Sequence, residues 1–186
     1  SLYVAAAPEI LRLTDTNDDG VADVREVWHD GATLTGCGND LHGPYLAANG
    51  RIEFTKGAFA AQTHDLPGRP GWTTRASHVF RCRPDGSDFE AVVTGGMDNP
   101  VDVAFTAAGE RLLSATFLTH PAGGLRDGVV HAVDGGVFGK DHGVLEGHPR
   151  TGDLLPALIQ LGPAAACGLH VHSGWGLGEA FADNAF

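Results

Sequence analysis

The sequence contains no long apolar run, few cysteines and none of the short cysteine motifs that hold metal or haem. No stretch approaches the roughly 18 apolar residues of a membrane-spanning helix, and no signal-peptide pattern occurs. The cysteines Cys37, Cys82 and Cys167 lie far apart, and neither CxxC nor CxxCH is found. We therefore expect no zinc ribbon or attached haem in this segment, and the odd cysteine count fits a disulfide framework poorly.

Positive charge is also scarce. The chain has 12 Lys plus Arg against 23 Asp plus Glu, which gives a net charge of −11. This balance argues against nucleic acid or an anionic membrane surface as the main partner. The sequence also lacks GxSxG, P-loop, HExxH and GxGxxG motifs, so a serine hydrolase, an NTPase, a zincin or a Rossmann dehydrogenase has no support.

What the chain does contain is many short apolar runs separated by turn residues, with 27 Gly and 10 Pro in 186 residues. Runs of four to seven residues rich in Val, Ile, Phe and Thr, bounded by Gly, Asp, Asn or Pro, are typical of strands joined by hairpins. They are found at residues 10–13, 24–28, 51–54, 78–82, 89–93, 101–105 and 111–117. The sequence therefore predicts an all-β fold.

An internal repeat organises these strands. Residues 39–57 align with residues 98–116 at a constant offset of 59, which places Gly50 on Gly109. Four-stranded units repeated at this scale predict β-propeller blades, and a β-sandwich is the alternative. At roughly 40 to 50 residues per blade, we expect about three four-stranded blades of a larger ring with long loops.

We expect residues 1–186 to be a fragment of a single propeller domain, since the sequence starts at Ser1 and ends without an obvious terminal element. Residues 58–77 are rich in Pro, Gly and Thr and are predicted to be an insertion loop. Residues 118–153 are predicted to be a Gly- and His-rich connection, within which a degenerate third copy of the repeat starts at residues 128–136.

The stretch "DTNDDGVADVRE" has the ligand spacing of a calcium loop. Oxygen donors stand at positions 1, 3, 5, 7, 9 and 12, from Asp15, Asn17, Asp19, Val21 (backbone carbonyl), Asp23 and Glu26. The repeat aligns this stretch with the plain "RPDGSD" turn, so we predict a calcium-binding turn between two outer strands. A turn that binds nothing and an EF-hand are the alternatives.

Candidate catalytic residues lie where the first strand of each repeat begins. His42 lies in "GNDLHGPY" in one copy, and "DNPVDV", which begins with Asp98 and Asn99, occupies the same place in the other. In propellers this end of the inner strand faces the central funnel, so Asn39, Asp40, His42, Asp98 and Asn99 are predicted to converge. We expect His42 to act as a general base, and a structural histidine that caps a turn is the alternative.

The Gly-rich connection carries the candidate cofactor-binding residues. Arg and Lys bind carboxylates, and Gly lets the backbone approach a flat ligand closely. The predicted set is His120, Arg126, Asp127, Lys140, His142 and Arg150. A solvated, irregular connection between blades is the alternative.

These segments together resemble a known family. The stretches "DTNDDGVADVREV", "HGPYLAANGRIEFTKGAF", "TGGMDNPVDVAFTAAGERLLSATF" and "HPAGGLRDGVVHAVDGGVFGKDH" are similar to membrane-bound dehydrogenase proteins common in planctomycetes, and the likeness covers nearly the whole chain. That family is related to the glucose/sorbosone dehydrogenase propellers, which use pyrroloquinoline quinone (PQQ). In those propellers the catalytic His opens a stretch ending in "GPDG". Aligned on Gly50 it falls at Asn39, and "AANG" replaces "GPDG", which makes His42 a displaced candidate.

The resemblance implies a propeller in the periplasm or cell envelope that oxidises a sugar or another alcohol. Electrons would pass to PQQ and then to a c-type cytochrome domain that lies outside this segment, while a His accepts the hydroxyl proton and Arg and Lys hold the cofactor. The alternative is a non-catalytic envelope propeller that binds carbohydrate or a protein partner.

Overall fold

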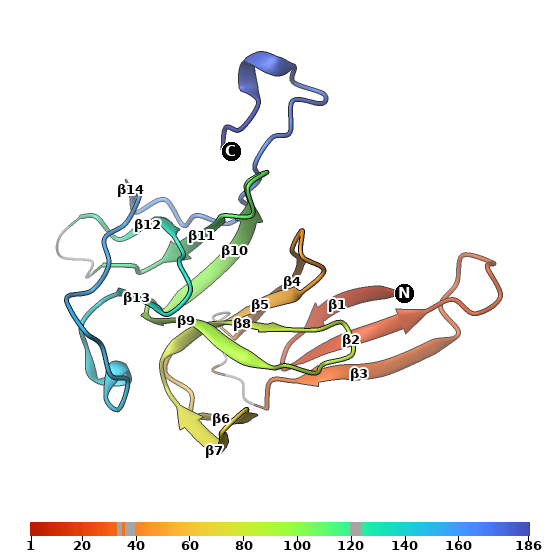
Figure 1. Cartoon of the computed structure of the whole chain (residues 1–186), viewed down its shortest axis with the longest axis horizontal. Coiled ribbons are helices and arrows are strands. Elements are labelled where there is room, and N and C mark those ends of the chain that lie inside the picture. Colours follow the sequence, from red (N-terminus) through yellow and green to blue (C-terminus); the bar gives the residue numbers. More distant parts are fainter. Residues whose placement is uncertain (33–34, 36–39, 120–123) are drawn as a thin grey trace.

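The computed structural model describes residues 1–32, 35, 40–119 and 124–186, and its strands form four separate sheets (Figure 1). Strands make up 47% of the chain and helix 3%, so the predicted all-β fold is confirmed. Within the described residues the sheets do not close into a barrel, as in a partial β-propeller.

Each sheet is built mainly from consecutive antiparallel strands. The first sheet contains β1 (Leu2–Ala6), β2 (Glu9–Thr14) and β3 (Val24–Asp30). The second contains β4 (Leu41–Leu46), β5 (Ile52–Lys56), β8 (Ser77–Cys82) and β9 (Glu90–Gly96), with β13 (Gly136–Gly139) parallel to β9. The third contains β10 (Asn99–Phe105), β11 (Arg111–Thr116), β12 (Asp127–His131) and β14 (Ile159–Gly162). The fourth is the hairpin of β6 (Gln62–Leu66) and β7 (Arg69–Thr74).

The 59-residue repeat is present in the structure. The β4–β5 and β10–β11 turns have the same hydrogen bonds, because Gly50 N–H donates to Ala47 O and Gly109 N–H donates to Thr106 O, each at 2.9 Å. Both glycines have a positive φ, 78° and 83°, which explains why the two turns share this residue. The second and third sheets are therefore successive copies of one unit.

The third sheet has the expected four strands, and the first and second sheets do not. The first sheet has three strands and the second has five, because β13 adds to the outer edge of β9. The β2–β3 and β8–β9 turns occupy corresponding positions, so the acidic loop lies at an outer turn as predicted.

Short strands occur both in the predicted insertion loop and in the Gly- and His-rich connection. Residues 58–77 form the β6–β7 hairpin around the turn at Pro67 and Gly68, where Gly68 has a φ of 73°. Residues 118–153 contain β12, β13 and the short 3-10 helix η2 (Gly143–Leu145). In both segments Gly residues with a positive φ form tight turns between short strands.

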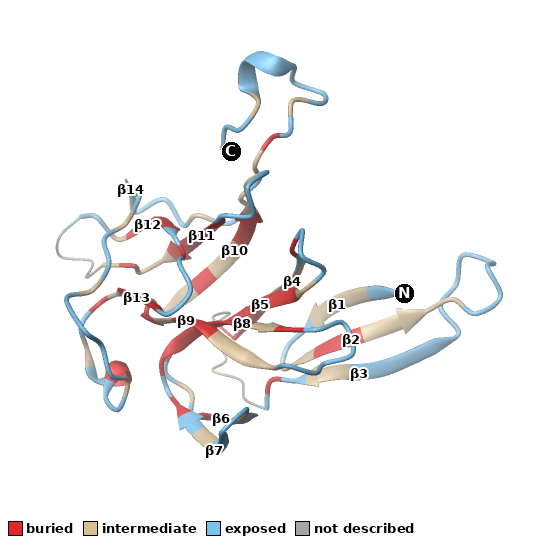
Figure 2. Cartoon of the chain, in the orientation of Figure 1, coloured by how far each residue is buried: buried red, intermediate tan, exposed pale blue. Residues whose placement is uncertain are grey.

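The apolar core lies between neighbouring sheets (Figure 2). Between the first and second sheets it includes Ile10, Leu41, Phe54 and Phe80. Between the second and third sheets it includes Val79, Val93, Met97, Leu113, Val130 and Phe138. Face-to-face packing of this kind fixes the sheets beside one another and brings the starts of their inner strands together.

The chain after β14 first lies against the third sheet, where the Leu169 N–H donates to Asp102, and then extends away from the sheets (Figure 1). It folds back on itself through an antiparallel bridge between Val171 and Ala185 and contains η3 (Glu179–Phe181). Among the described residues, no helix has the length and apolar character needed to cross a membrane.

Candidate functional site

The inner strands of the second and third sheets begin beside one another, and this brings the predicted catalytic residues together. His42 lies near the start of β4, and Asn99 is the first residue of β10. His42 Nε2 is 2.7 Å from Asn99 Oδ1. The hydroxyl of Thr55 on β5 donates to the carbonyl of Pro100 at 2.6 Å, which holds the start of β10 against the second sheet.

Two ion pairs with buried lysines flank this contact. Lys140 pairs with Asp98, and Lys56 Nζ is 3.4 Å from Asp40 Oδ1. Burial lowers the pKa of Lys56, and the Asp40 carboxylate opposes this effect. Burial alone would raise the pKa of Asp40, but hydrogen bonds from Thr35 and the charge of Lys56 hold it below its ordinary value. We call Asp40, His42, Lys56, Asp98, Asn99 and Lys140 the polar cluster.

Phe117, directly after β11, connects the polar cluster to the next pair of charges. Its ring lies 5.5 Å from Lys140 Nζ and 4.6 Å from Arg126 Cζ, so both cations contact one aromatic face or its edge. Arg126 binds Asp127 through two hydrogen bonds of 2.8 and 2.7 Å. Although burial works in the opposite direction, Arg126 and the N–H groups of Phe117 and Ala165 lower the pKa of Asp127 to about 2.

The remaining predicted cofactor residues lie at the edge of this region. His142 Nε2 is 3.1 Å from Gly96 O, at the end of β9. Arg150 binds Asp141 at 3.0 Å, and these two residues and His142 line a cavity of about 280 Å³ with Gly143, Leu145 and Glu146. His120 and Asn39 lie outside the described residues.

Two residues of this region were not singled out from the sequence. Lys56 is the last residue of a fully buried strand, and the repeat aligns it with Ala115. A charged residue where the other copy has an alanine is a sequence feature that could have indicated a polar site. Phe117 has a φ of 51°, in the left-handed region, which no sequence pattern indicated.

The acidic loop binds its own backbone. Asp15 accepts hydrogen bonds from the N–H groups of Asp18 at 2.7 Å and Gly20 at 2.8 Å, and Asp23 accepts two from Thr16. The hydrogen bond from Gly20 is the main reason why the pKa of Asp15 is lowered. Strands flank the loop on both sides, so the EF-hand alternative is wrong.

Five of the six predicted calcium ligands lie in the β2–β3 turn, and the sixth, Glu26, does not. Glu26 lies within β3 and pairs with Arg12 on β2, away from the loop. Across the part of the chain that the structure describes, no three His, Cys, Asp or Glu side chains converge as a metal-binding group. The remaining donors, from Asp15, Asn17, Asp19, Val21 and Asp23, are the hard oxygens that calcium prefers.

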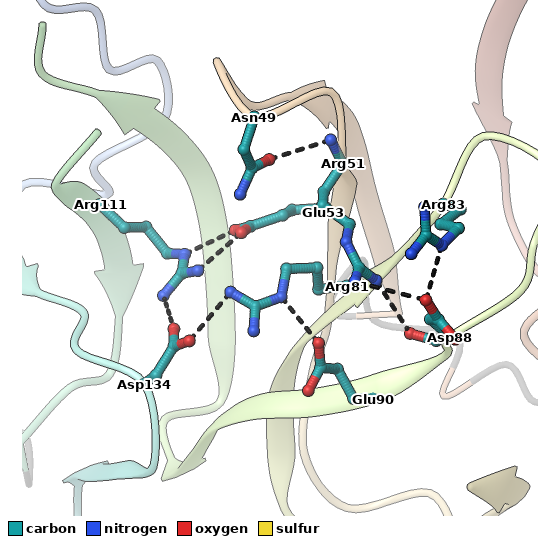
Figure 3. Close-up of polar contacts among 9 residues, drawn as sticks. All are labelled: Asn49, Arg51, Glu53, Arg81, Arg83, Asp88, Glu90, Arg111 and Asp134. Carbon is teal, nitrogen blue, oxygen red and sulfur yellow. Dashed lines mark hydrogen bonds and ion pairs between the residues drawn. The ribbon is translucent and has the colours of Figure 1, made fainter. Parts of the chain in front are cut away.

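A larger cavity of about 620 Å³ lies between the second and third sheets, away from the polar cluster, and a charged network forms one wall. Arg111 binds both carboxylate oxygens of Glu53, at 2.5 and 2.6 Å (Figure 3). It also contacts Asp134 at 3.0 Å, and Asp134 in turn contacts Arg81 at 2.9 Å. Because the arginines already have carboxylate partners, this network clamps two sheets together.

Comparison with known proteins identifies a family. A family profile described as a domain of unknown function (DUF7133) matches residues 1–132, which include His42, Asp98, Asn99, Arg126 and Asp127. No curated protein and no solved structure matches the chain.

Proposed function

The chain belongs to the DUF7133 family, whose function is unknown, and we propose that the polar cluster is the substrate site of a quinone-dependent sugar or alcohol dehydrogenase. The observation that carries this proposal is the 2.7 Å contact between His42 and Asn99 where two inner strands begin. The resemblance to dehydrogenase propellers supports the same reading, and it also suggests a location in the periplasm or cell envelope.

His42 has the chemistry that this reaction requires. Oxidation of an alcohol removes a hydride from carbon and a proton from the hydroxyl, and an imidazole nitrogen is a suitable proton acceptor. When Asn99 Oδ1 accepts from Nε2, the other ring nitrogen keeps its lone pair for the substrate hydroxyl. Asn99 is then a positioning residue that fixes the tautomer of His42.

The charges of the polar cluster suit a neutral substrate. Lys56 is paired with Asp40 and Lys140 with Asp98, so no net charge faces the ligand from these two pairs. Paired carboxylates, ammonium groups and amides still offer hydrogen bonds to hydroxyl groups. A sugar or a small polyol meets these requirements better than an acid.

PQQ is an anionic tricarboxylate, and the described residues do not fit it well. The cations predicted to hold it, Arg126, Lys140 and Arg150, each have a carboxylate partner already. A quinone acceptor and a c-type cytochrome domain remain proposals that come from the resemblance.

A dye-reduction assay tests the proposal. The full chain is supplied with calcium and PQQ and is offered a panel of aldoses and alcohols. We expect His42→Ala to lower turnover by about 100-fold or more, and His131→Ala, at an exposed pair with Glu110, to leave it unchanged. Circular dichroism checks that both variants are folded. Absence of dye reduction with every substrate, or full activity of His42→Ala, would overturn the proposal.

A non-catalytic carbohydrate-binding propeller is the second candidate. The observation that favours it is the pairing of the predicted cofactor-binding cations, because sugar binding needs no anionic cofactor. Calorimetric binding of a sugar without any dye reduction would select this function.

We also propose that calcium binds the β2–β3 turn through Asp15, Asn17, Asp19, the Val21 carbonyl and Asp23. The donor chemistry and the spacing support the site, and Glu26 is left out because it pairs with Arg12. Calcium would then fix an outer turn and take no part in the reaction at the polar cluster.

A further inference from the structure

Phe59, in the loop between β5 and β6, has a conformation that bulky residues rarely adopt. Its φ is 88°, in the left-handed region that favours glycine. Its side chain is also 38% exposed, and among the described residues it belongs to none of the three apolar clusters. An exposed aromatic ring on a strained backbone position is a recognised sign of a functional site.

The surrounding chain holds Phe59 in place. Its N–H donates to Arg75 O at 2.9 Å, and Arg75 Nε donates to Phe59 O at 2.9 Å. The preceding residue, Ala58, donates its N–H to Asp98 O at 3.1 Å, within the polar cluster. Backbone hydrogen bonds therefore connect the loop that carries Phe59 to the candidate substrate site.

The Phe59 ring stands beside a cavity with polar walls. Its centroid is 5.7 Å from that of His142, and His142 lines the cavity of about 280 Å³. Asp141, Glu146 and Arg150 line the same cavity and provide hydrogen-bond acceptors and donors. This volume is near the lower end of ligand pockets, which run from roughly 300 to 1,000 Å³.

We propose that Phe59 and His142 form an aromatic subsite that stacks against one face of a sugar ring, with Asp141, Glu146 and Arg150 binding its hydroxyl groups. A pyranose has an apolar face of C–H groups and a rim of hydroxyls, so it needs an aromatic surface next to hydrogen-bonding side chains. The inference rests on the proposed function and narrows its substrate class from alcohols in general to cyclic sugars.

Isothermal titration of the full chain with D-glucose, D-galactose and D-xylose tests the subsite, with glycerol as a probe that has no ring face. Phe59→Trp is expected to bind the best of these sugars within about three-fold of the wild type, because it keeps an aromatic face. Phe59→Leu and Phe59→Gly are expected to lose at least ten-fold in sugar affinity. Glycerol binding is expected to be the same in all four proteins.

Phe59→Gly separates a binding role from a folding role. Glycine adopts a φ of 88° without strain, so this variant is expected to melt no lower than the wild type while it loses sugar binding. Absence of binding of all three sugars to the wild type, or wild-type sugar affinity in Phe59→Leu and Phe59→Gly, would overturn the subsite.

The same titrations distinguish the subsite from the dehydrogenase. His131→Ala, at an exposed pair outside both the polar cluster and the cavity, is expected to keep the wild-type sugar affinity. Sugar binding that depends on Phe59 in a protein that reduces no dye would uphold the subsite and reject the dehydrogenase.

Discussion

Arg111 is the residue that joins the second sheet to the third at the end away from the polar cluster. It binds Glu53 through two hydrogen bonds while both side chains are buried, and it reaches Asp134 and the Ala132 carbonyl with its remaining nitrogen. A buried ion pair of this geometry is strongly destabilising when only one partner is removed, because the other charge stays buried and unpaired.

The repeat suggests how to remove this pair without a loss of packing. At the offset of 59, Arg111 corresponds to Ile52 and Glu53 corresponds to Leu112. We expect Arg111→Ile and Glu53→Leu each to lower the free energy of unfolding by about 3–5 kcal/mol. The double variant is expected to recover much of that loss, since it leaves no buried charge unpaired.

Urea denaturation of the two single variants and the double variant measures this coupling. Arg83→Ala is the matched control, because Arg83 and Asp88 are 57% and 52% exposed (Figure 3) and such a pair contributes less than about 1 kcal/mol. Additive losses in the double variant would contradict the argument.

At the scale of elements, local patterns predicted those strands whose partners are near in sequence. The β4–β5 and β10–β11 turns follow from "AANG" and "TAAGE", where a glycine must take a positive φ. The parallel pairing of β13 with β9 did not follow, because no local signal specifies a partner forty residues away. The β6–β7 hairpin did not follow either, because Pro67, Gly68 and Pro70 are as typical of a long loop as of a tight turn between short strands.

The candidate site was predictable to a similar degree. The repeat correctly brought His42 next to Asn99, since both stand at the start of an inner strand. The contact of Lys140 with Asp98 depends on where β13 places the end of the connection, which the sequence pattern does not indicate. The contact of Lys140 with the Phe117 ring depends on the left-handed backbone conformation of Phe117. Such contacts depend on tertiary structure, which the sequence pattern does not specify.

The β2–β3 turn gives a prediction of its own at this scale. Calorimetric titration of the full chain with calcium is expected to release or absorb heat, and the melting temperature is expected to rise. A stabilisation of about 2.7 kcal/mol corresponds to calcium at 100 times its dissociation constant. Asp15→Ala should abolish both effects, because Asp15 occupies the first ligand position.

Glu26→Gln is the informative control for the turn. Glu26 pairs with Arg12 across β2 and β3, so its substitution should leave calcium affinity nearly unchanged. A large loss in this variant would show that the twelfth position does reach the ion. No heat and no rise in melting temperature at millimolar calcium would reject the site altogether.

At the scale of the whole molecule, several histidines are held neutral between the sheets. Burial is the main cause in each case, and it lowers the pKa of His29 and His64 to about 4 and that of His78 to about 3. The charge of His64, whose ring lies 6.2 Å from that of His29, further lowers the pKa of His29, and the charge of Lys56 further lowers the pKa of His64. An unfolded chain would protonate all three near pH 6.5.

Stability is therefore expected to fall as the pH drops from about 6.5 toward 4. Over this range the unfolded chain binds protons that the folded chain does not, so the free energy of unfolding decreases. For the fully buried His78 and the nearly buried His64, the loss at pH 5 is about 1–2 kcal/mol each. Carboxylates with lowered pKa values, such as Asp127, lose their contribution only at lower pH.

Urea denaturation at pH 7 and pH 5 measures the effect. His64→Phe removes one of the titrating groups and keeps an aromatic ring beside Phe80 and Phe89, so its stability should depend less steeply on pH than that of the wild type. The test compares how steeply the free energy of unfolding changes with pH in the two proteins. The absolute free energy is less informative, because the variant also loses the contact with Gln62. Equal slopes, or a wild type that is as stable at pH 5 as at pH 7, would show that these histidines do not control the acid sensitivity of the fold.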